Sequence, residues 1–169
     1  MGSGMSHNLQ AYLTQADQPP LLFYNRTPAR GTSLTALGGR QAPSIQALVE
    51  ECDVIFLSLS DDIALGAVIT SITETGTSLQ GKLIVDTSTV HPDSTQLAFD
   101  KISKSGASFV AAPVFGASPV AAEGKLLFVV AGGEEQVTRI EPYIVGVMGR
   151  AVIKMGSDVR RATALKTIG

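Results

Sequence analysis

Apolar residues recur along the chain at two spacings. Met1, Met5, Leu9 and Leu13 lie four residues apart, which predicts one face of a helix. This helix must end before Pro19, because proline cannot continue a helix. Elsewhere the apolar residues form short continuous runs, which are typical of strands buried in a parallel sheet. The predicted strands cover residues 21–24, 53–57, 83–85, 109–111, 126–131 and 151–153.

Segments with helical character separate these runs. We expect helices before residue 37, over 44–51, from 60–62 through 72, from 92 through 102, from 134 onward, and over 158–168. Strands that alternate with helices of about a dozen residues predict βαβ units. The pattern therefore indicates an α/β fold of the Rossmann type, a doubly wound and mostly parallel sheet with helices on both faces.

The loops that follow the strands are the expected place for ligands. Right-handed crossovers place strand-to-helix loops at the carboxyl edge of the sheet, where folds of this class bind their ligands. Four of these loops are therefore candidate ligand-binding segments: residues 25–27, 59–62, 87–92 and 113–118.

The two ends of the chain suggest a domain without its flanking parts. The chain opens with a Gly-rich turn that enters a helix, whereas a doubly wound domain normally opens with a strand, and it ends at Gly169 inside a predicted helix. We expect a nucleotide-binding domain over residues 1–156 that lacks its first strand. Residues 157–169 would begin an interdomain helix, with a helical C-terminal domain missing.

Composition narrows the class of partner. The 169 residues are 44% hydrophobic and 17% charged with a net charge of -2, which suits one globular domain and excludes a largely disordered chain. The charge gives no bias toward nucleic acid or anionic membranes, and no apolar run could span a bilayer. One cysteine and two distant histidines form no spaced metal motif. We expect a cytoplasmic protein, with a mitochondrial location left open, that binds a small molecule.

Two features bear on a dinucleotide cofactor. Gly2 and Gly4 begin the first predicted helix, where backbone N–H groups can approach a phosphate, although a flexible start rich in small residues also explains them. The next predicted strand ends in Asn25-Arg26-Thr27, at the position that selects the cofactor in dinucleotide folds. No acid is nearby, and Arg26 offers forked donors to a phosphate. The pattern favours NADP over NAD, with a solvated arginine as the alternative.

Other polar residues have both a structural and a functional interpretation. Helix capping explains Asp61 and Asp62 without any catalytic role. The hydroxyls of residues 87–89 can bind a carboxylate or a ribose, while His91 fits a surface loop. Lys166 can exchange a proton with a substrate oxygen, but an exposed helical lysine is the commoner case.

Taken in order, several short motifs resemble those of the β-hydroxyacid dehydrogenase family. This family includes 3-hydroxyisobutyrate dehydrogenase and the NADP-binding domain of 6-phosphogluconate dehydrogenase. Residues 1–9 resemble the end of its Gly-rich signature, and Asn25-Arg26-Thr27 is similar to the N-R-T of NADP-using members. Residues 86–92 are similar to the family's D-x-S-T-x-x-P loop, and residues 112–117 to its A-P-V-S-G-G loop. Residues 124–133 are similar to the later G-x-L-x-x-x-V-G-G pattern, and residues 156–166 to the segment that ends in the family's lysine.

The resemblance implies an NADP-dependent oxidoreductase that transfers hydride between the cofactor and a hydroxy acid or its aldehyde or keto partner. It implies Lys166 as the catalytic acid/base, a homodimer for the full-length protein, and little or no activity for this chain alone. The cofactor residues would be Met1, Gly2, Asn25, Arg26, Thr27, Leu59, Ser60 and Thr89. The substrate residues would be Phe115, Gly116 and Ala117.

Departures from the family pattern keep other functions open. Phe115 replaces a serine and Ala117 a glycine, which suggests a larger or more apolar substrate, and Arg160-Arg161 stand where small residues usually precede the lysine. A non-catalytic NADP-binding or interaction module is one alternative. A reductase of imine-like substrates on the same fold is another, although such relatives usually lack the lysine.

Overall fold

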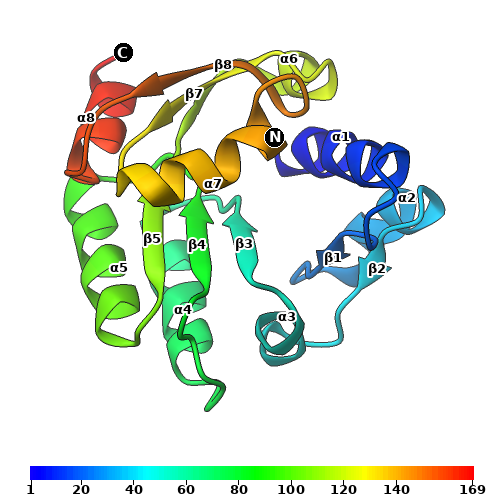
Figure 1. Cartoon of the computed structure of the whole chain (residues 1–169), viewed down its shortest axis with the longest axis horizontal. Helices are drawn as coiled ribbons and strands as arrows, with labels where there is room; N and C mark the ends of the chain where they lie inside the picture. Colours follow the sequence, from blue (N-terminus) through cyan, green and yellow to red (C-terminus); the bar gives the residue numbers. More distant parts are fainter.

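Helices and strands alternate along the chain in a computed structural model that describes residues 1–169 (Figure 1). The first part contains α1 (Gly2–Gln15), β1 (Leu22–Phe23), the 3-10 helix η1 (Pro28–Gly31), α2 (Thr32–Ala36), β2 (Arg40–Gln41) and α3 (Ile45–Glu51). The middle part contains β3 (Val54–Leu57), α4 (Asp62–Thr73), β4 (Leu83–Asp86), α5 (Pro92–Lys104) and β5 (Ser108–Ala111). The last part contains β6 (Val114–Phe115), α6 (Ser118–Ala122), β7 (Leu126–Val130), α7 (Glu134–Ile144), β8 (Gly149–Lys154) and α8 (Arg160–Ile168).

The strands form three hydrogen-bonded groups. β1 pairs in parallel with β2, and β3, β4 and β5 form a parallel sheet in that order. In the third group β7 lies between β6, which is antiparallel to it, and β8, which is parallel. An antiparallel bridge between Ala111 and Ala131 connects the second group to the third. The expected α/β fold with a mostly parallel sheet is confirmed.

Apolar helices cover both faces of the central sheet. One cluster of buried side chains lies among α3, α4, α5 and α8, and the other lies among α1, α6 and α7. β4 runs between the two clusters, and all four of its residues are buried. This burial on both faces explains why its sequence reads as a continuous apolar run. None of the helices is both long and apolar enough to cross a bilayer.

Several expectations need correction. β2, β6 and α6 were not predicted, because each has five residues or fewer and so offers no periodic pattern. The turn after β7 is also displaced from the carboxyl edge of the sheet. Because β7 meets β5 in antiparallel orientation, this turn lies beside β5, where a Cβ on Gly132 would be 2.8 Å from Val110.

Candidate functional site

A large cavity separates β1 from β3 and opens near the start of α1. Its volume is about 930 Å³, and four of the predicted cofactor residues line it: Met1, Gly2, Asn25 and Leu59. Gly2 approaches the end of β3 so closely that a Cβ there would lie 3.0 Å from the Ser58 hydroxyl oxygen. The absence of a side chain therefore brings the backbone of α1 close to the loop after β3.

Arg26 lies in a different, shallower hollow of about 380 Å³ at the end of β1. Its lining residues are Tyr24, Asn25, Arg26, Pro28, Gln41, Ala42 and Pro43, and none of them is acidic. The Arg26 side chain is exposed and takes part in none of the ion pairs of the structure. Thr27 beside it is exposed and forms no capping hydrogen bond to η1. This guanidinium is therefore available to an anion from outside the protein.

The loop after β3 uses most of its polar groups within the protein. The backbone N–H of Leu59 donates to the Ser88 hydroxyl at 2.9 Å, and the Ser60 hydroxyl donates to Asp61 at 3.2 Å. Asp61 in turn accepts from the Ala64 backbone N–H at 2.8 Å and caps α4. The capping interpretation of Asp61 is confirmed.

The three hydroxyls after β4 differ in burial and in hydrogen bonding. Thr87 is buried and donates to the Leu57 carbonyl at 2.6 Å, and Ser88 is buried and holds Leu59. Thr89 is exposed and has no side-chain hydrogen bond within the chain. Of the three, only Thr89 offers its hydroxyl to a ligand.

Asp86, at the end of β4, is the main buried acid of this edge. Its Oδ1 accepts from the Ser88 backbone N–H at 3.0 Å, whereas its Oδ2 is buried without a partner. Burial raises the pKa of this carboxyl to about 6, and the hydrogen bonds from Ser88 oppose the rise only in part. The motif around Asp86 predicted no separate role for this carboxyl, because the burial of a strand end cannot be deduced from nearby residues.

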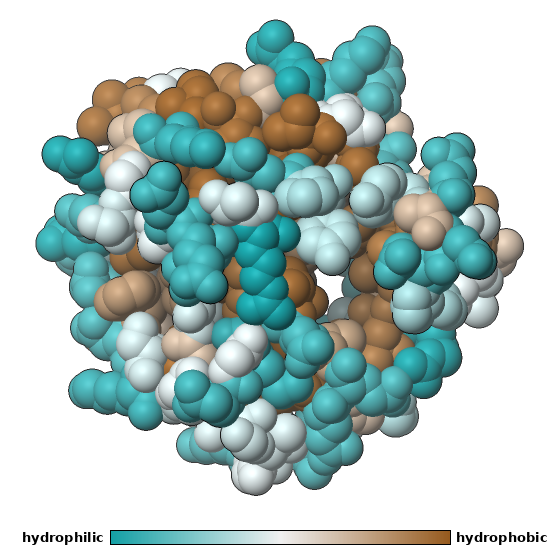
Figure 2. Space-filling model, viewed as in Figure 1, coloured by the Kyte–Doolittle hydropathy of each residue, from teal (hydrophilic) through white to brown (hydrophobic).

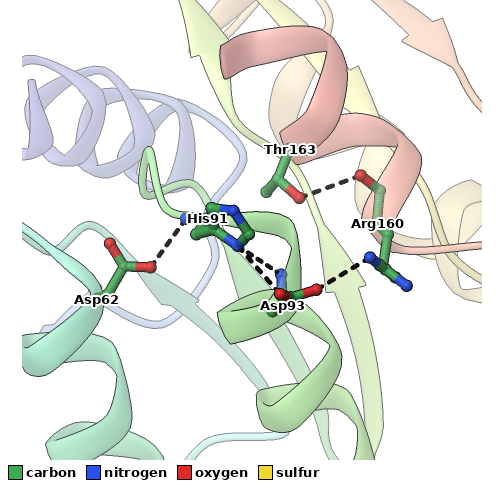
Figure 3. Close-up of polar contacts among 5 residues, drawn as sticks. All are labelled: Asp62, His91, Asp93, Arg160 and Thr163. Carbon is green, nitrogen blue, oxygen red and sulfur yellow. Dashed lines mark hydrogen bonds and ion pairs between the residues drawn. The ribbon is translucent and has the colours of Figure 1, made fainter. Parts of the chain in front are cut away.

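A chain of polar contacts connects α4, α5 and α8 (Figure 3). Asp62 accepts from the His91 backbone N–H at 2.8 Å, and His91 Nδ1 caps α5 by accepting from the Asp93 N–H at 3.1 Å. Asp93 forms an ion pair with Arg160 at 2.9 Å, which attaches the start of α8 to the start of α5. Hydrogen bonds from Ser94 and His91 lower the pKa of Asp62. Apart from acids near the helix starts, no sequence pattern predicted this arrangement.

Lys166 and Phe115 lie against one another. The Lys166 Nζ is 4.4 Å from the centre of the Phe115 ring, a cation–π distance, and both side chains are half-buried. Gly116 follows with φ +136°, and a Cβ there would come within 2.7 Å of Leu126, so this turn requires glycine. Ala117 is exposed at the start of α6.

The predicted residues therefore form separate groups rather than one enclosed pocket. Met1, Gly2, Asn25 and Leu59 share the large cavity, and Arg26 lies in the neighbouring hollow with Asn25. Thr27, Ser60, Thr89, Phe115, Gly116, Ala117 and Lys166 line neither cavity. Such an open arrangement suits an extended ligand that lies along a sheet edge.

Comparison with known proteins finds relatives that are oxidoreductases. It is 37% identical over 149 residues to the NADH-dependent oxidoreductase ucdB of Aspergillus ustus, covering 87% of this chain and 51% of that protein. It is 31% identical over 175 residues to the chloroplastic glyoxylate/succinic semialdehyde reductase 2 of Arabidopsis thaliana, covering 99% of this chain and 45% of that protein. The chain spans about half the length of these relatives.

Solved structures show the same fold. The 3-hydroxyisobutyrate dehydrogenase of Mycobacterium tuberculosis superposes with a TM-score of 0.88 and 24% identity, over 99% of this chain and 55% of that one. An imine reductase from Myxococcus stipitatus in complex with NADP+ superposes with a TM-score of 0.84 and 20% identity, over 99% of this chain and 56% of that one.

A family match covers most of the sequence. Residues 1–156 match the family described as the NAD binding domain of 6-phosphogluconate dehydrogenase. The open sheet edge, the close approach of Gly2 and the free Arg26 agree with a domain that binds a nicotinamide dinucleotide. The chain belongs to the family of NAD-binding domains of 6-phosphogluconate dehydrogenase and the related 3-hydroxyisobutyrate dehydrogenase-like hydroxyacid dehydrogenases.

Proposed function

We propose that this chain is the NADP-binding part of an oxidoreductase that acts on a hydroxy acid or its aldehyde or keto partner. The observation that carries the cofactor preference is Arg26, which is exposed, unpaired and set in a hollow without an acid. A guanidinium binds a phosphate with two parallel hydrogen bonds, and only NADP has a phosphate on the 2′-oxygen of the adenosine ribose. An acid at this place would instead bind the ribose hydroxyls of NAD.

Other residues fit the remaining parts of a dinucleotide. The bare backbone at Gly2 allows close approach to a pyrophosphate, and Thr89 offers a free hydroxyl at the same edge of the sheet. Leu59, which is half-buried beside the cavity, would contact the nicotinamide part, with Ser60 next to it. Met1, Asn25 and Thr27 complete the proposed cofactor residues.

We assign to Lys166 the role of the acid that protonates the substrate oxygen. When bound, the cofactor supplies or accepts the hydride. In the reducing direction the Lys166 ammonium would give one proton to the carbonyl oxygen as that carbon gains the hydride, so the product is an alcohol and the lysine becomes neutral. Gly116 and Ala117 would donate backbone N–H groups to the substrate, and Phe115 would cover the lysine side chain.

The first experiment is a fluorescence titration of this chain with NADPH and with NADH. Arg26→Ala should weaken NADPH by about 1.5–3 kcal/mol, or about 10- to 150-fold in Kd, and leave NADH nearly unchanged. Arg150→Ala, which removes an exposed arginine on β8, is the matched control and should change neither Kd. Equal losses for both cofactors would reject the preference, as would tighter binding of NADH by the unchanged chain.

The second experiment tests turnover. With the chain joined to a helical domain that completes the cleft, Lys166→Ala should abolish reduction of short aldehydes and keto acids while NADPH affinity stays within about twofold. Retained turnover would remove the lysine from the mechanism.

Phe115 favours one further candidate, a reductase of imine-like substrates. An aromatic ring where the family has a serine makes the site more apolar, and Lys166 packs against this ring. If cyclic imines are reduced faster than any hydroxy-acid partner, and Phe115→Ser reverses that order, this function replaces the first. Tight NADPH binding without turnover of either class would instead indicate a non-catalytic binding module.

A further inference from the structure

The first helix, α1, connects two separate parts of the candidate site. Residues of α1 line the large cavity, and the same helix packs against α6 (Figure 1). The hollow beside α1 is open on the face of the molecule shown in Figure 2. Gly2, at the start of α1, is among the proposed cofactor residues, whereas α6 directly follows residues 115–117, which we propose to hold the substrate.

Gly4 brings the backbones of α1 and α6 together. A Cβ on Gly4 would lie 2.8 Å from the backbone nitrogen of Ala122 and 2.9 Å from the carbonyl carbon of Ala121. Both distances are shorter than the contacts that Cβ atoms make in proteins. The two helices therefore meet here without a side chain of α1 between them.

Asn8, one turn further along α1, forms hydrogen bonds across this contact. Its Nδ2 donates to the carbonyls of Ala121 at 2.9 Å and Ala122 at 3.1 Å, and also to the Gly4 carbonyl at 3.0 Å. Ala121 and Ala122 are the last residues of α6, where carbonyls have no partner within the helix. Asn8 thus caps the end of a helix that lies 113 residues away in the sequence.

The position of α6 determines the position of the proposed substrate turn. A Cβ on Gly116 would lie 3.0 Å from the Val120 side chain of α6, and the Ala117 carbonyl accepts from the Ala121 N–H at 3.0 Å. A helix of five residues is not stable alone, so its place depends on the contacts that hold it. A displacement of α6 would therefore move Gly116 and Ala117 as well.

We propose that Asn8 is a positioning residue that couples cofactor binding at the start of α1 to the turn of residues 115–117, a role that rests on the proposed function. The bound dinucleotide would fix the first turn of α1, and the Asn8 side chain would pass this constraint to the end of α6. Asn8 lines neither cavity, so it acts through α6 rather than by touching a ligand. The alternative is that Asn8 only stabilises α6.

The test measures hydrogen exchange of the amides of residues 116–124 with and without NADPH. In the unchanged chain, NADPH should slow this exchange at least about fivefold, the lower range of couplings between sites. In Asn8→Ala the same ligand should slow it by less than about twofold. Asn8→Ser should behave like Asn8→Ala, because its hydroxyl can bond to the Gly4 carbonyl within α1 but is too short to reach α6. The serine variant carries the test if the alanine variant does not fold.

A matched control separates coupling from mere stabilisation of α6. Glu123→Gly places a flexible residue at the exposed end of α6 and leaves the contacts of Asn8 in place. The amides of residues 116–124 should then exchange faster without ligand, but NADPH should still slow them at least about fivefold. If NADPH loses its effect in Glu123→Gly as well, Asn8 has a structural role only and the proposal is overturned.

The coupling must also act in the reverse direction, since linkage between two binding sites is reciprocal. Gly116→Ala should push α6 aside through Val120 and weaken NADPH at least about fivefold in Kd. Once Asn8→Ala has separated the helices, the same substitution should change the Kd by less than about twofold. Equal effects of Gly116→Ala in both backgrounds would contradict the coupling.

The remaining outcomes distinguish this proposal from the proposed function. Tight NADPH binding with unchanged exchange at residues 116–124, or with equal slowing in Asn8→Ala, would overturn the coupling and leave the proposed function standing. Binding of NADH in place of NADPH would refute the cofactor preference, and the comparison would then use NADH, because both dinucleotides carry the pyrophosphate. Binding of neither would refute the proposed function and, with it, the coupling.

Discussion

Asp86 provides the sharpest test of the electrostatics at the carboxyl edge of the sheet. Its side chain is buried, one oxygen has no partner, and its pKa is raised to about 6 from 3.8. The substitution Asp86→Asn keeps the shape and the Oδ1 acceptor for the Ser88 N–H, and it removes the titration. We therefore expect the variant to change how stability depends on pH more clearly than it changes stability at any one pH.

The magnitude follows from the two pKa values of Asp86. A folded-state pKa above that of the unfolded chain means that the folded protein holds the proton more tightly. The free energy of unfolding of the wild type should therefore fall as pH rises between about 4 and 6. The difference between 3.8 and about 6 corresponds to about 3 kcal/mol above pH 6. An amide NH2 buried in place of Oδ2 costs about 1–3 kcal/mol, so the net gain of the variant at pH 7 is at most about 2 kcal/mol.

Urea denaturation from pH 4.5 to pH 7.5 measures this effect. Relative to the wild type, Asp86→Asn should gain about 2 kcal/mol across this range, with almost all of the gain below pH 6.5. Asp100→Asn, at an exposed aspartate of α5, serves as the control and should run parallel to the wild type. Parallel profiles for Asp86→Asn as well would refute the assignment of a buried, proton-binding carboxyl to this position.

Three further predictions concern stability and are checked by the same urea denaturation at pH 7. Gly116→Ala should destabilise the protein by about 1–3 kcal/mol, because the new Cβ would collide with Leu126 of β7. Gly66→Ala should instead stabilise the protein by about 0.5–1 kcal/mol, because a Cβ at this position of α4 would meet no other atom. Asp61→Ala should cost about 1 kcal/mol through loss of the cap of α4, and Asp61→Asn should restore most of it. A double-mutant cycle on Asp93 and Arg160 should give a coupling below about 1 kcal/mol, because both side chains are more than half exposed.

The layout of the fold could be predicted from the sequence wherever burial produces a pattern. Residues 83–85 form a run without polar interruption because β4 is buried on both faces, and residues 44–51 open with a serine that caps α3 through the Ala47 N–H. Such features are local, so their signals lie within a few residues. β6 and α6 lacked this signal, since two- and five-residue elements depend on the strands beside them.

The sequence predicted which residues belong to the candidate site, but not how they are arranged in space. Family resemblance selected Arg26 and Lys166 one by one, but the open hollow around Arg26 depends on the turn between β2 and α3, which is distant in sequence. The sequence likewise could not show which of the Thr87 and Thr89 hydroxyls is bonded within the protein. The first donates to the Leu57 carbonyl and the second is free, and this difference arises only when β3 and β4 pair.

Arg160 shows how a departure from the family pattern acquires a physical reason. In the sequence it stands where small residues usually precede the lysine. In the structure its side chain binds Asp93, which attaches the start of α8 to the start of α5, and its carbonyl accepts from the Thr163 hydroxyl at 3.2 Å within α8 (Figure 3). Lys166 lies on the same helix, against Phe115. Since the ion pair is exposed, it contributes little stability, and it orients α8 only together with the buried contacts that Val159 and Ala162 make in the core.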